Sequence, residues 1–104
     1  MSIRRPIPDL PASLADLFDA FQNPTRVIVV RYVLAHPGVT RQGIVEGTGA
    51  AAAPVYRALA ALEQAGYLSA DATPGARSGR TVHYTADRAK LSADAGALFG
   101  WFVS

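Results

Sequence analysis

The chain has 104 residues, of which half are hydrophobic and only 17% are charged, and it contains no cysteine. This composition predicts one folded domain with a core of its own and argues against a disordered chain. The lack of cysteine excludes disulfides, thiolate metal sites and thiol-based redox sensing. The net charge of +2 permits binding to nucleic acid without requiring it.

Charge type and hydropathy indicate where the protein works. Most of its basic residues are arginines, whose planar guanidinium suits forked contacts to phosphate and guanine. The last apolar stretch, residues 95–103, is much shorter than the ~20 residues that a membrane-spanning helix needs. Arg4 and Arg5 precede Pro-Ile-Pro rather than an apolar signal core. We therefore expect a cytoplasmic protein without a membrane partner, and a DNA-binding protein in that compartment would be associated with the nucleoid.

The sequence divides into an extended arm, residues 1–12, and a single domain, residues 13–104. The prolines of the arm argue against a helix there. A helix is expected to begin at Ser13, which forms a capping pattern with Asp16. Apolar residues then recur on one face of this helix at Leu14, Leu17, Phe18 and Phe21.

The next segment is ambiguous, because residues 27–30 are β-branched and would by themselves predict a strand. Asn23 and Pro24 form a helix start signal, and His36-Pro37-Gly38 forms a stop signal. These signals favour a helix from 24 to about 35. Its apolar residues lie on nearly all faces, which predicts the buried central helix of the domain.

Two further helices, a hairpin and a last helix follow. Thr40 is expected to cap a short helix over 41–47, and a glycine turn separates that helix from one that ends at Gly66. Residues 67–85 predict a β-hairpin with a long polar tip, in which Val82 and Tyr84 face the same way. The last helix is expected from 88 to about 102.

This order of elements predicts a mainly α-helical winged helix-turn-helix, with about five helices and a two-stranded wing. Two helices joined by a glycine turn indicate the helix-turn-helix, and the hairpin that follows them directly has the position of a wing. In such a domain the second helix of the pair is the candidate reader of the DNA major groove.

Several segments resemble ArsR-type regulators, and the recognition helix also resembles that of PadR regulators. The segments are Asn23-Pro24-Thr25-Arg26, Pro54-Val55-Tyr56-Arg57-Ala58-Leu59, Leu62-Glu63-Gln64-Ala65-Gly66-Tyr67-Leu68 and Arg80-Thr81-Val82-His83-Tyr84. The resemblance covers residues 14–103. It implies a bacterial transcriptional regulator, with repression as the expected action, that binds double-stranded operator DNA of palindromic sequence as a homodimer. It also implies that the first and last helices form the dimer interface.

The expected DNA contacts lie on the recognition helix, before it and on the wing. Arg57 and Tyr56 are expected to reach into the major groove, whereas Ala52 and Ala53 can at most contact a thymine methyl. The wing has no acid between Ala72 and Ala86, so its basic side chains are expected to neutralise phosphates. The predicted set is Thr40, Arg41, Ala52, Ala53, Tyr56, Arg57, Arg77, Arg80 and His83.

The apolar stripes of the first and last helices exceed what one small core can cover, which predicts a dimer interface. The predicted interface residues are Leu14, Leu17, Phe18, Phe21, Leu98, Phe99, Trp101 and Phe102.

No cofactor, metal site or enzymatic activity is predicted. The last helix offers only Asp94 as a candidate ligand, and His36 and His83 are far apart in sequence. A G-x-G-x-x-A pattern at 47–52 follows a helix rather than the strand that dinucleotide binding requires. Two other hypotheses stay open: a winged helix that binds a protein partner, and a phage or plasmid DNA-binding protein for recombination or replication. The sequence names no operator and no effector ligand.

Overall fold

The computed structural model describes residues 11–104. The predicted arm therefore lies almost entirely outside the described residues. The described helices are α1 (Ala12–Ala20), α2 (Pro24–Ala35), α3 (Arg41–Thr48), α4 (Ala52–Gln64) and α5 (Arg88–Val103). The strands are β1 (Val39–Thr40), β2 (Leu68–Ala70) and β3 (His83–Ala86), and a short 3-10 helix, η1 (Pro74–Ala76), lies between β2 and β3. The predicted fold class, mainly helical with a hairpin after the third and fourth helices, is confirmed.

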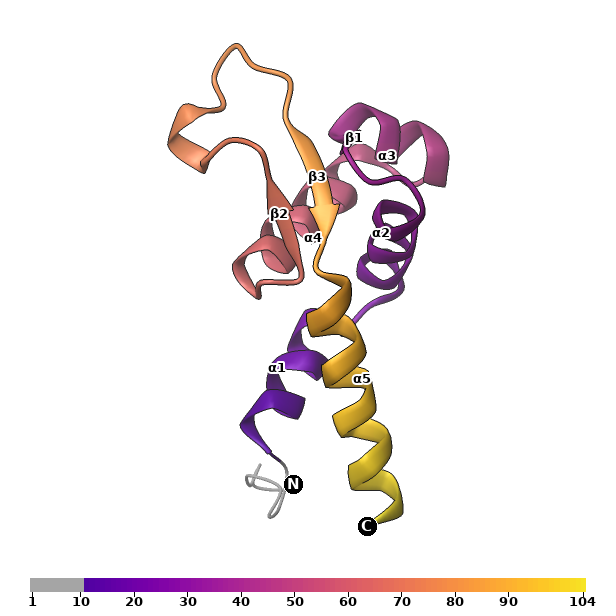
Figure 1. Ribbon diagram of the computed structural model, residues 1–104. Coiled ribbons are helices and arrows are strands. Elements are labelled where there is room, and N and C mark those ends of the chain that lie inside the picture. The colour runs from indigo at the N-terminus through magenta and orange to yellow at the C-terminus, as the bar shows by residue number, and fades with distance from the viewer. Residues whose placement is uncertain (1–10) are drawn as a thin grey trace, which may run out of the picture.

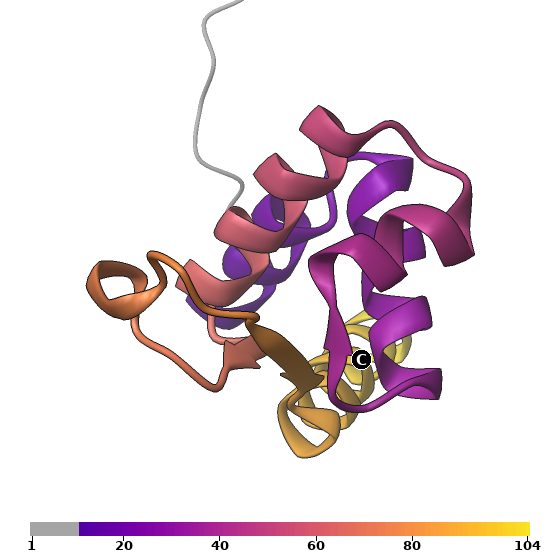
Figure 2. The ribbon, with the colours of Figure 1, turned by 90° about the horizontal axis from the view of Figure 1, so that it is seen from above.

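Helices α2, α3 and α4 and the sheet form one packed body, and helices α1 and α5 form a helical pair at one end of it. Helix α2 packs against α3, α4 and β3, and α1 packs against α5. Figure 1 shows α1 and α5 at the end of the molecule opposite the hairpin tip, and Figure 2 shows the body from above. Because α5 extends beyond the body, the radius of gyration is 15.3 Å. A compact domain of this length has a radius of gyration of roughly 13 Å.

Helix α2 is the element whose type the sequence left most open, and the helix prediction is confirmed. The Asn23 side chain accepts a hydrogen bond from the backbone N–H of Arg26 at 3.1 Å, and Pro24 occupies the first helical position. The prediction that α2 is buried on nearly all of its faces, however, is wrong. Val29 and Val33 are fully buried, whereas Val27 and Ile28 are about half exposed, because α2 is covered only on the side that faces α3, α4 and β3.

Helix α1 begins one residue earlier than predicted, at Ala12, and no side chain caps it. The predicted capping pattern of Ser13 and Asp16 is therefore wrong. The carbonyl of Pro11 accepts hydrogen bonds from the N–H groups of Leu14 and Ala15 at 3.0 and 3.2 Å, which closes the first turn on the backbone. Ser13 thus falls inside the helix rather than before it.

The sheet has a third strand that the sequence did not indicate. Its order is β1-β3-β2, with Val39 opposite Tyr84 and Thr40 opposite His83 in an antiparallel pair. The prediction of a two-stranded wing alone was incomplete because β1 has only two residues, too few to show alternation. The alternation in the hairpin itself is confirmed, since Val82 and Tyr84 are both buried.

The core is continuous from α1 through the helix-turn-helix to the hairpin. Its buried members are Leu14, Leu17, Ala20, Val29, Val30, Val33, Ile44, Val55, Ala58, Leu59, Leu62, Tyr67, Leu68, Ala72, Val82 and Tyr84. The buried residues of α4 recur with helical spacing, so one face of α4 packs inward while the opposite face stays open.

Tyr67 joins the sheet to the helical pair. Its fully buried ring lies 5.1 Å from the ring of Phe21, and its hydroxyl donates to Asp94 Oδ2 at 2.5 Å. Lys90 Nζ lies 3.3 Å from the same carboxylate oxygen and 4.7 Å from the Tyr67 ring centroid. Burial and the bond to Asp94 raise the pKa of Tyr67, and the hydrogen bond from Tyr67 lowers the pKa of Asp94.

Replacing Tyr67 by Phe should lower the free energy of unfolding at neutral pH by about 1–2 kcal/mol, because the Asp94 carboxylate loses its strongest donor. Since the pKa of Asp94 is lowered in the folded state, its contribution is present above the unfolded pKa and lost as pH falls through the folded one. The difference between wild type and variant should therefore shrink below about pH 4. Urea unfolding at pH 7 and pH 3 measures both effects.

Tyr84→Phe is the matched control. Tyr84 is also buried, but its hydroxyl forms no hydrogen bond with residues 11–104. An equal loss of stability in both variants would contradict a specific role for the Tyr67–Asp94 bond.

Candidate nucleic-acid interface

Helices α3 and α4 are joined by a turn with fixed geometry. Gly49 ends α3 in the left-handed region, with φ at 72°, where a side chain would be strained. The Thr48 hydroxyl donates to the carbonyl of Ile44 at 2.7 Å and accepts from the N–H of Ala50 at 3.2 Å. With Ile44 and Val55 fully buried beneath the turn, the angle between the two helices is set by both packing and hydrogen bonds.

The open face of α4 carries the residues predicted to read DNA. Ala52, Ala53, Tyr56 and Arg57 are all exposed, and they lie in the N-terminal half of the helix. No side chain caps this end of α4, so its first N–H groups stay available to an acceptor outside the helix. The face of α4 that points away from the core is thus accessible. It carries small alanine side chains at the N-terminal end of the helix and an arginine about one turn later.

Four of the predicted residues, Thr40, Arg41, Tyr56 and Arg80, meet at one pocket. A pocket of about 230 Å³ lies between the start of α3, Tyr56 of α4 and the hairpin segment that precedes β3, with both Arg41 and Arg80 in its lining. The guanidinium carbon of Arg41 lies 4.9 Å from the Tyr56 ring centroid, a cation–π contact that holds Arg41 against α4. Among the described residues, Arg41, Arg57 and Arg80 form no ion pair.

Arg77 and His83 differ from these three arginines, because each of them pairs with a carboxylate. Arg77 Nη2 lies 2.5 Å from Glu63 Oε2, and the hydrogen bond to Glu63 raises the pKa of Arg77. His83 Nδ1 lies 2.8 Å from Asp71 Oδ2, and its backbone N–H also binds this carboxylate, which lowers the pKa of Asp71.

The hairpin is therefore compensated in part, since Arg77 and His83 have carboxylate partners, whereas Arg80 has none among the described residues. Its segment contains no acid between residues 72 and 86, but Glu63 of α4 and Asp71 just before the loop supply the carboxylates. Thr40 is likewise committed within the chain, since its hydroxyl accepts from the N–H of Gly43 at 3.0 Å and caps α3.

A second pocket adds residues that the sequence did not single out for binding. It measures about 260 Å³ and brings Thr25 and Arg26, at the head of α2, beside Arg57 of α4. Nothing in the local pattern around Arg26 indicated this, because the two arginines are 31 positions apart and meet only in the fold.

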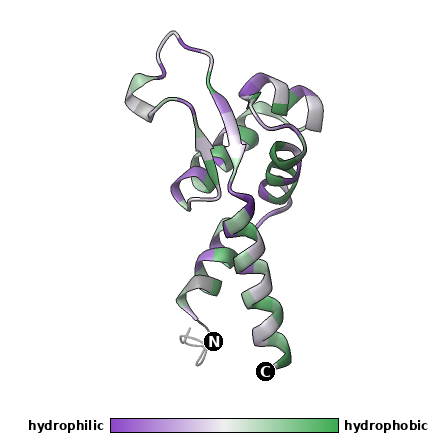
Figure 3. Ribbon diagram, viewed as in Figure 1, coloured by the Kyte–Doolittle hydropathy of each residue, from purple (hydrophilic) through white to green (hydrophobic). Residues whose placement is uncertain are grey.

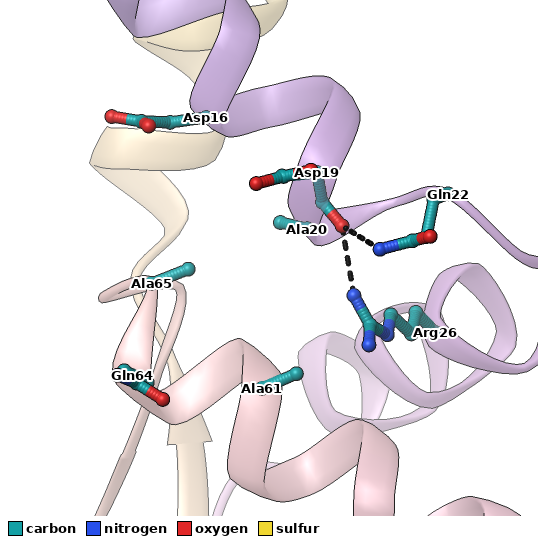
Figure 4. Close-up of a pocket in the computed structure, with 8 residues that line it drawn as sticks. All are labelled: Asp16, Asp19, Ala20, Gln22, Arg26, Ala61, Gln64 and Ala65. Atoms are coloured by element: carbon teal, nitrogen blue, oxygen red, sulfur yellow. Dashed lines mark hydrogen bonds between the residues drawn. The ribbon is translucent and has the colours of Figure 1, made fainter.

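A wider cavity of about 450 Å³, drawn in Figure 4, lies between the end of α1, the start of α2 and α4. Its lining includes the carboxylates of Asp16 and Asp19, which do not suit a phosphate. Arg26 Nη1 and Gln22 Nε2 both donate to the Asp19 carbonyl, at 2.8 and 3.1 Å, and so satisfy the last turn of α1. We assign this cavity to the junction of the helices rather than to the basic surface.

The residues predicted for dimerisation divide into two groups. Leu14 and Leu17 are buried within the chain, and Phe21, Leu98 and Trp101 are partly buried against the core. Phe18, Phe99 and Phe102 are 46%, 67% and 65% exposed. Val103, which was not in the predicted set, is 66% exposed beside them in sequence. Figure 3 shows that hydrophobic residues recur along the C-terminal half of α5.

The described part of the chain contains neither a candidate metal cluster nor a candidate membrane-spanning helix. Residues 11–104 bring together no group of three or more His, Cys, Asp or Glu side chains suited to a metal ion. None of the described helices is both long enough and apolar enough to cross a membrane.

Solved structures with the same arrangement are transcriptional regulators. An ArsR-like transcriptional regulator from Rhodococcus sp. RHA1 matches with a TM-score of 0.70 and 21% identity, over 88% of this chain and 81% of that chain. A possible transcriptional regulator for arsenical resistance matches with a TM-score of 0.64 and 24% identity, over 84% of this chain and 83% of that one. This chain has the winged-helix fold of ArsR-type regulators.

The same fold occurs in a protein solved with its nucleic acid. Streptococcus pneumoniae FabT, in complex with DNA, matches with a TM-score of 0.54 and 18% identity, over 77% of this chain and 53% of that one. No protein-family model matches the sequence, and neither does any curated protein. In this fold α3 and α4 are the helix-turn-helix, α4 has the position of a recognition helix, and residues 68–86 have the position of the wing.

Removing the cap of the helix-turn-helix should destabilise the winged helix. Thr40→Ala deletes the acceptor for the N–H of Gly43 and should lower the free energy of unfolding by about 1 kcal/mol, whereas Thr40→Ser keeps the hydroxyl and most of the stability. Urea unfolding compares the two variants. Thr81→Ala serves as the control, because the exposed Thr81 side chain forms no hydrogen bond with the described residues, and an equal loss there would contradict the cap.

Proposed function

We propose that this protein is a DNA-binding transcriptional regulator. The observation that carries the proposal is the group of exposed arginines, Arg41, Arg57 and Arg80, around the open face of α4, none of which has an ion-pair partner in residues 11–104. Unpaired guanidinium groups on a helix-turn-helix and its wing suit the phosphates and guanine edges of duplex DNA.

The arginines divide between backbone contacts and base contacts. Arg41 and Arg80 flank α4 on the side of the wing, so we assign them to phosphates on that side of the groove. Arg57 and Tyr56 project from α4 itself and are assigned to the major groove. Ala52 and Ala53 let the helix approach the bases closely but offer no hydrogen bonds, so DNA shape should contribute to specificity.

The exposed apolar face of α1 and α5 supports a homodimer. Phe18, Phe99, Phe102 and Val103 are large apolar side chains at or above 46% exposure in a single chain. A two-fold pairing through this face covers them and presents two recognition helices to one duplex. The matching DNA is a palindrome whose half-sites lie about 34 Å apart. A bound dimer would block access to a promoter, so we propose repression as its action and the cytoplasm, where the chromosome lies, as its location.

Binding of duplex DNA should depend strongly on salt. Arg41 and Arg80 of both protomers neutralise about four phosphates per dimer, so log K should fall with log salt at a slope of roughly −3.6. Arg80→Ala or Arg41→Ala should flatten this slope by about two per dimer and weaken specific and random DNA alike. Arg57→Ala should instead cost about 1–3 kcal/mol per half-site and relax the preference at one base pair. Fluorescence anisotropy over a salt series measures both quantities.

Arg88→Ala is the matched control for these variants. It removes the same charge at the start of α5, beyond the end of β3 that is remote from the wing tip (Figure 1). It should leave the slope within about half a unit of wild type. If wild type bound no duplex, or if Arg88→Ala and Arg80→Ala weakened binding equally, the proposal would fail and a protein-binding winged helix would replace it.

The proposed homodimer predicts the mass of the protein in solution. Sedimentation equilibrium at micromolar protein should give about twice the 10.9 kDa of one chain. Phe99→Glu places a charge on the apolar face and should give a folded monomer. Ala93→Glu is the control, since Ala93 is exposed on the same helix about a third of a turn around from Phe99 and should leave the dimer intact. A monomeric wild type, or a dimeric Phe99→Glu protein, would contradict this interface.

A further inference from the structure

We propose that Glu63 and Arg77 form a lock that fixes the wing on the recognition helix and so presents Arg80 to the DNA backbone. Both are positioning residues in this proposal, because neither needs to touch DNA. The inference deepens the proposed function and rests on it for the DNA contact, whereas the lock itself is a property of the free protein.

The pair joins two elements that are separate in the chain. Glu63 lies in the last turn of α4, and Arg77 directly follows η1 in the wing. Arg77 Nη2 donates to Glu63 Oε2 at 2.5 Å, and the two side chains are only 20% and 23% exposed. Partial burial reduces the screening that weakens fully exposed ion pairs, so this contact holds the wing more firmly than a surface pair would.

Arg77 also binds the rest of the wing. Its Nε donates to the carbonyl of Ala72 at 2.9 Å, across the loop from its own position. Its guanidinium carbon lies 6.0 Å from the ring centroid of Tyr84, which belongs to β3. The Arg77 side chain thus contacts α4, the start of the loop at Ala72 and strand β3. Its planar guanidinium has several N–H donors, so it can make these contacts at the same time.

A tight turn transmits the position of Arg77 to Arg80. The N–H of Arg80 donates to the carbonyl of Arg77 at 3.1 Å, and Gly79 has φ at 71°, the left-handed value that such a turn requires. Arg80 in turn lines the pocket that also contains Arg41 and Tyr56. A shift of Arg77 away from Glu63 would therefore carry Arg80 away from α4.

The loop has little else in the described structure to hold it. The strand pairing of β2 and β3 begins below it, and the bridge between Asp71 and His83 closes only its base. Ser78, Gly79 and Arg80 are all exposed, with no buried contact to restrain them. Opening the Glu63–Arg77 pair should therefore free residues 73–80 while leaving the helices and the sheet intact.

Hydrogen exchange on the free protein tests the lock without DNA. Glu63→Gln keeps the size of the side chain but removes its charge, and should speed exchange of the Arg80 amide by about tenfold or more while exchange in α2 and α4 stays unchanged. The charge swap, Glu63→Arg with Arg77→Glu, should restore slow exchange in part, because it rebuilds the ion pair but loses the hydrogen bond from residue 77 to the Ala72 carbonyl. Glu46→Gln, the same change on α3, should leave the wing at the wild-type rate. Unchanged exchange in Glu63→Gln would overturn the lock, whatever the DNA results are.

A double-mutant cycle on DNA tests the presentation of Arg80. If the lock places Arg80, then Arg80→Ala weakens DNA binding in wild type but changes it less than about twofold in the Glu63→Gln background, where the contact is already lost. The salt slope of Glu63→Gln alone should then match that of Arg80→Ala. An equal penalty for Arg80→Ala in both backgrounds would show that the pair does not position Arg80. A wild type that binds no duplex would refute the proposed function, and the exchange experiment would still decide the lock.

Discussion

The fold depends on the burial of Tyr67 and on the one polar contact that this burial demands. The ring lies at the point where α4 has ended, β2 is about to begin and the helical pair of α1 and α5 meets the body. Tyr67 is fully buried, so its hydroxyl cannot bind water, and Asp94 of α5 supplies the hydrogen-bond partner. The backbone carbonyl of Tyr67 also accepts from the N–H of Asp87, just before α5. The same residue thus couples the helix-turn-helix and the hairpin to the helices that carry the exposed apolar side chains.

The fold was largely predictable from the sequence because its boundaries are marked by local chemistry. Asn23 and Pro24 start α2, Thr40 caps α3 and Gly49 ends it, and each of these signals acts within four residues. Alternation placed Val82 and Tyr84 on the buried side of the hairpin. The failures lie where no local pattern exists. The first turn of α1 closes on a proline carbonyl, and β1 is two residues of pairing that only β3 makes visible.

The candidate site was predictable only in part, for a different reason. The sequence locates Arg41, Tyr56, Arg57 and Arg80 on the correct elements, because helical period and hairpin position suffice for that. It does not show which charges are already compensated. Glu63 is 14 positions from Arg77 and belongs to another element, so its carboxylate could not be counted against the wing from the sequence alone. Charge balance is a property of three-dimensional neighbours rather than of segments.

The short strand β1 constrains how a chain of this kind can change in evolution. Thr40 is paired with His83 and also caps α3, so one residue both pairs with the wing strand β3 and fixes the start of the helix-turn-helix. Side chains alternate along a strand, and one residue inserted between 83 and 86 would turn Tyr84 from the core to solvent. Insertions between 73 and 80 leave this register untouched. The strand register alone therefore tolerates a longer or shorter tip but no change of length in the base, whereas the turn from Arg77 to Arg80 would be altered by an insertion within it.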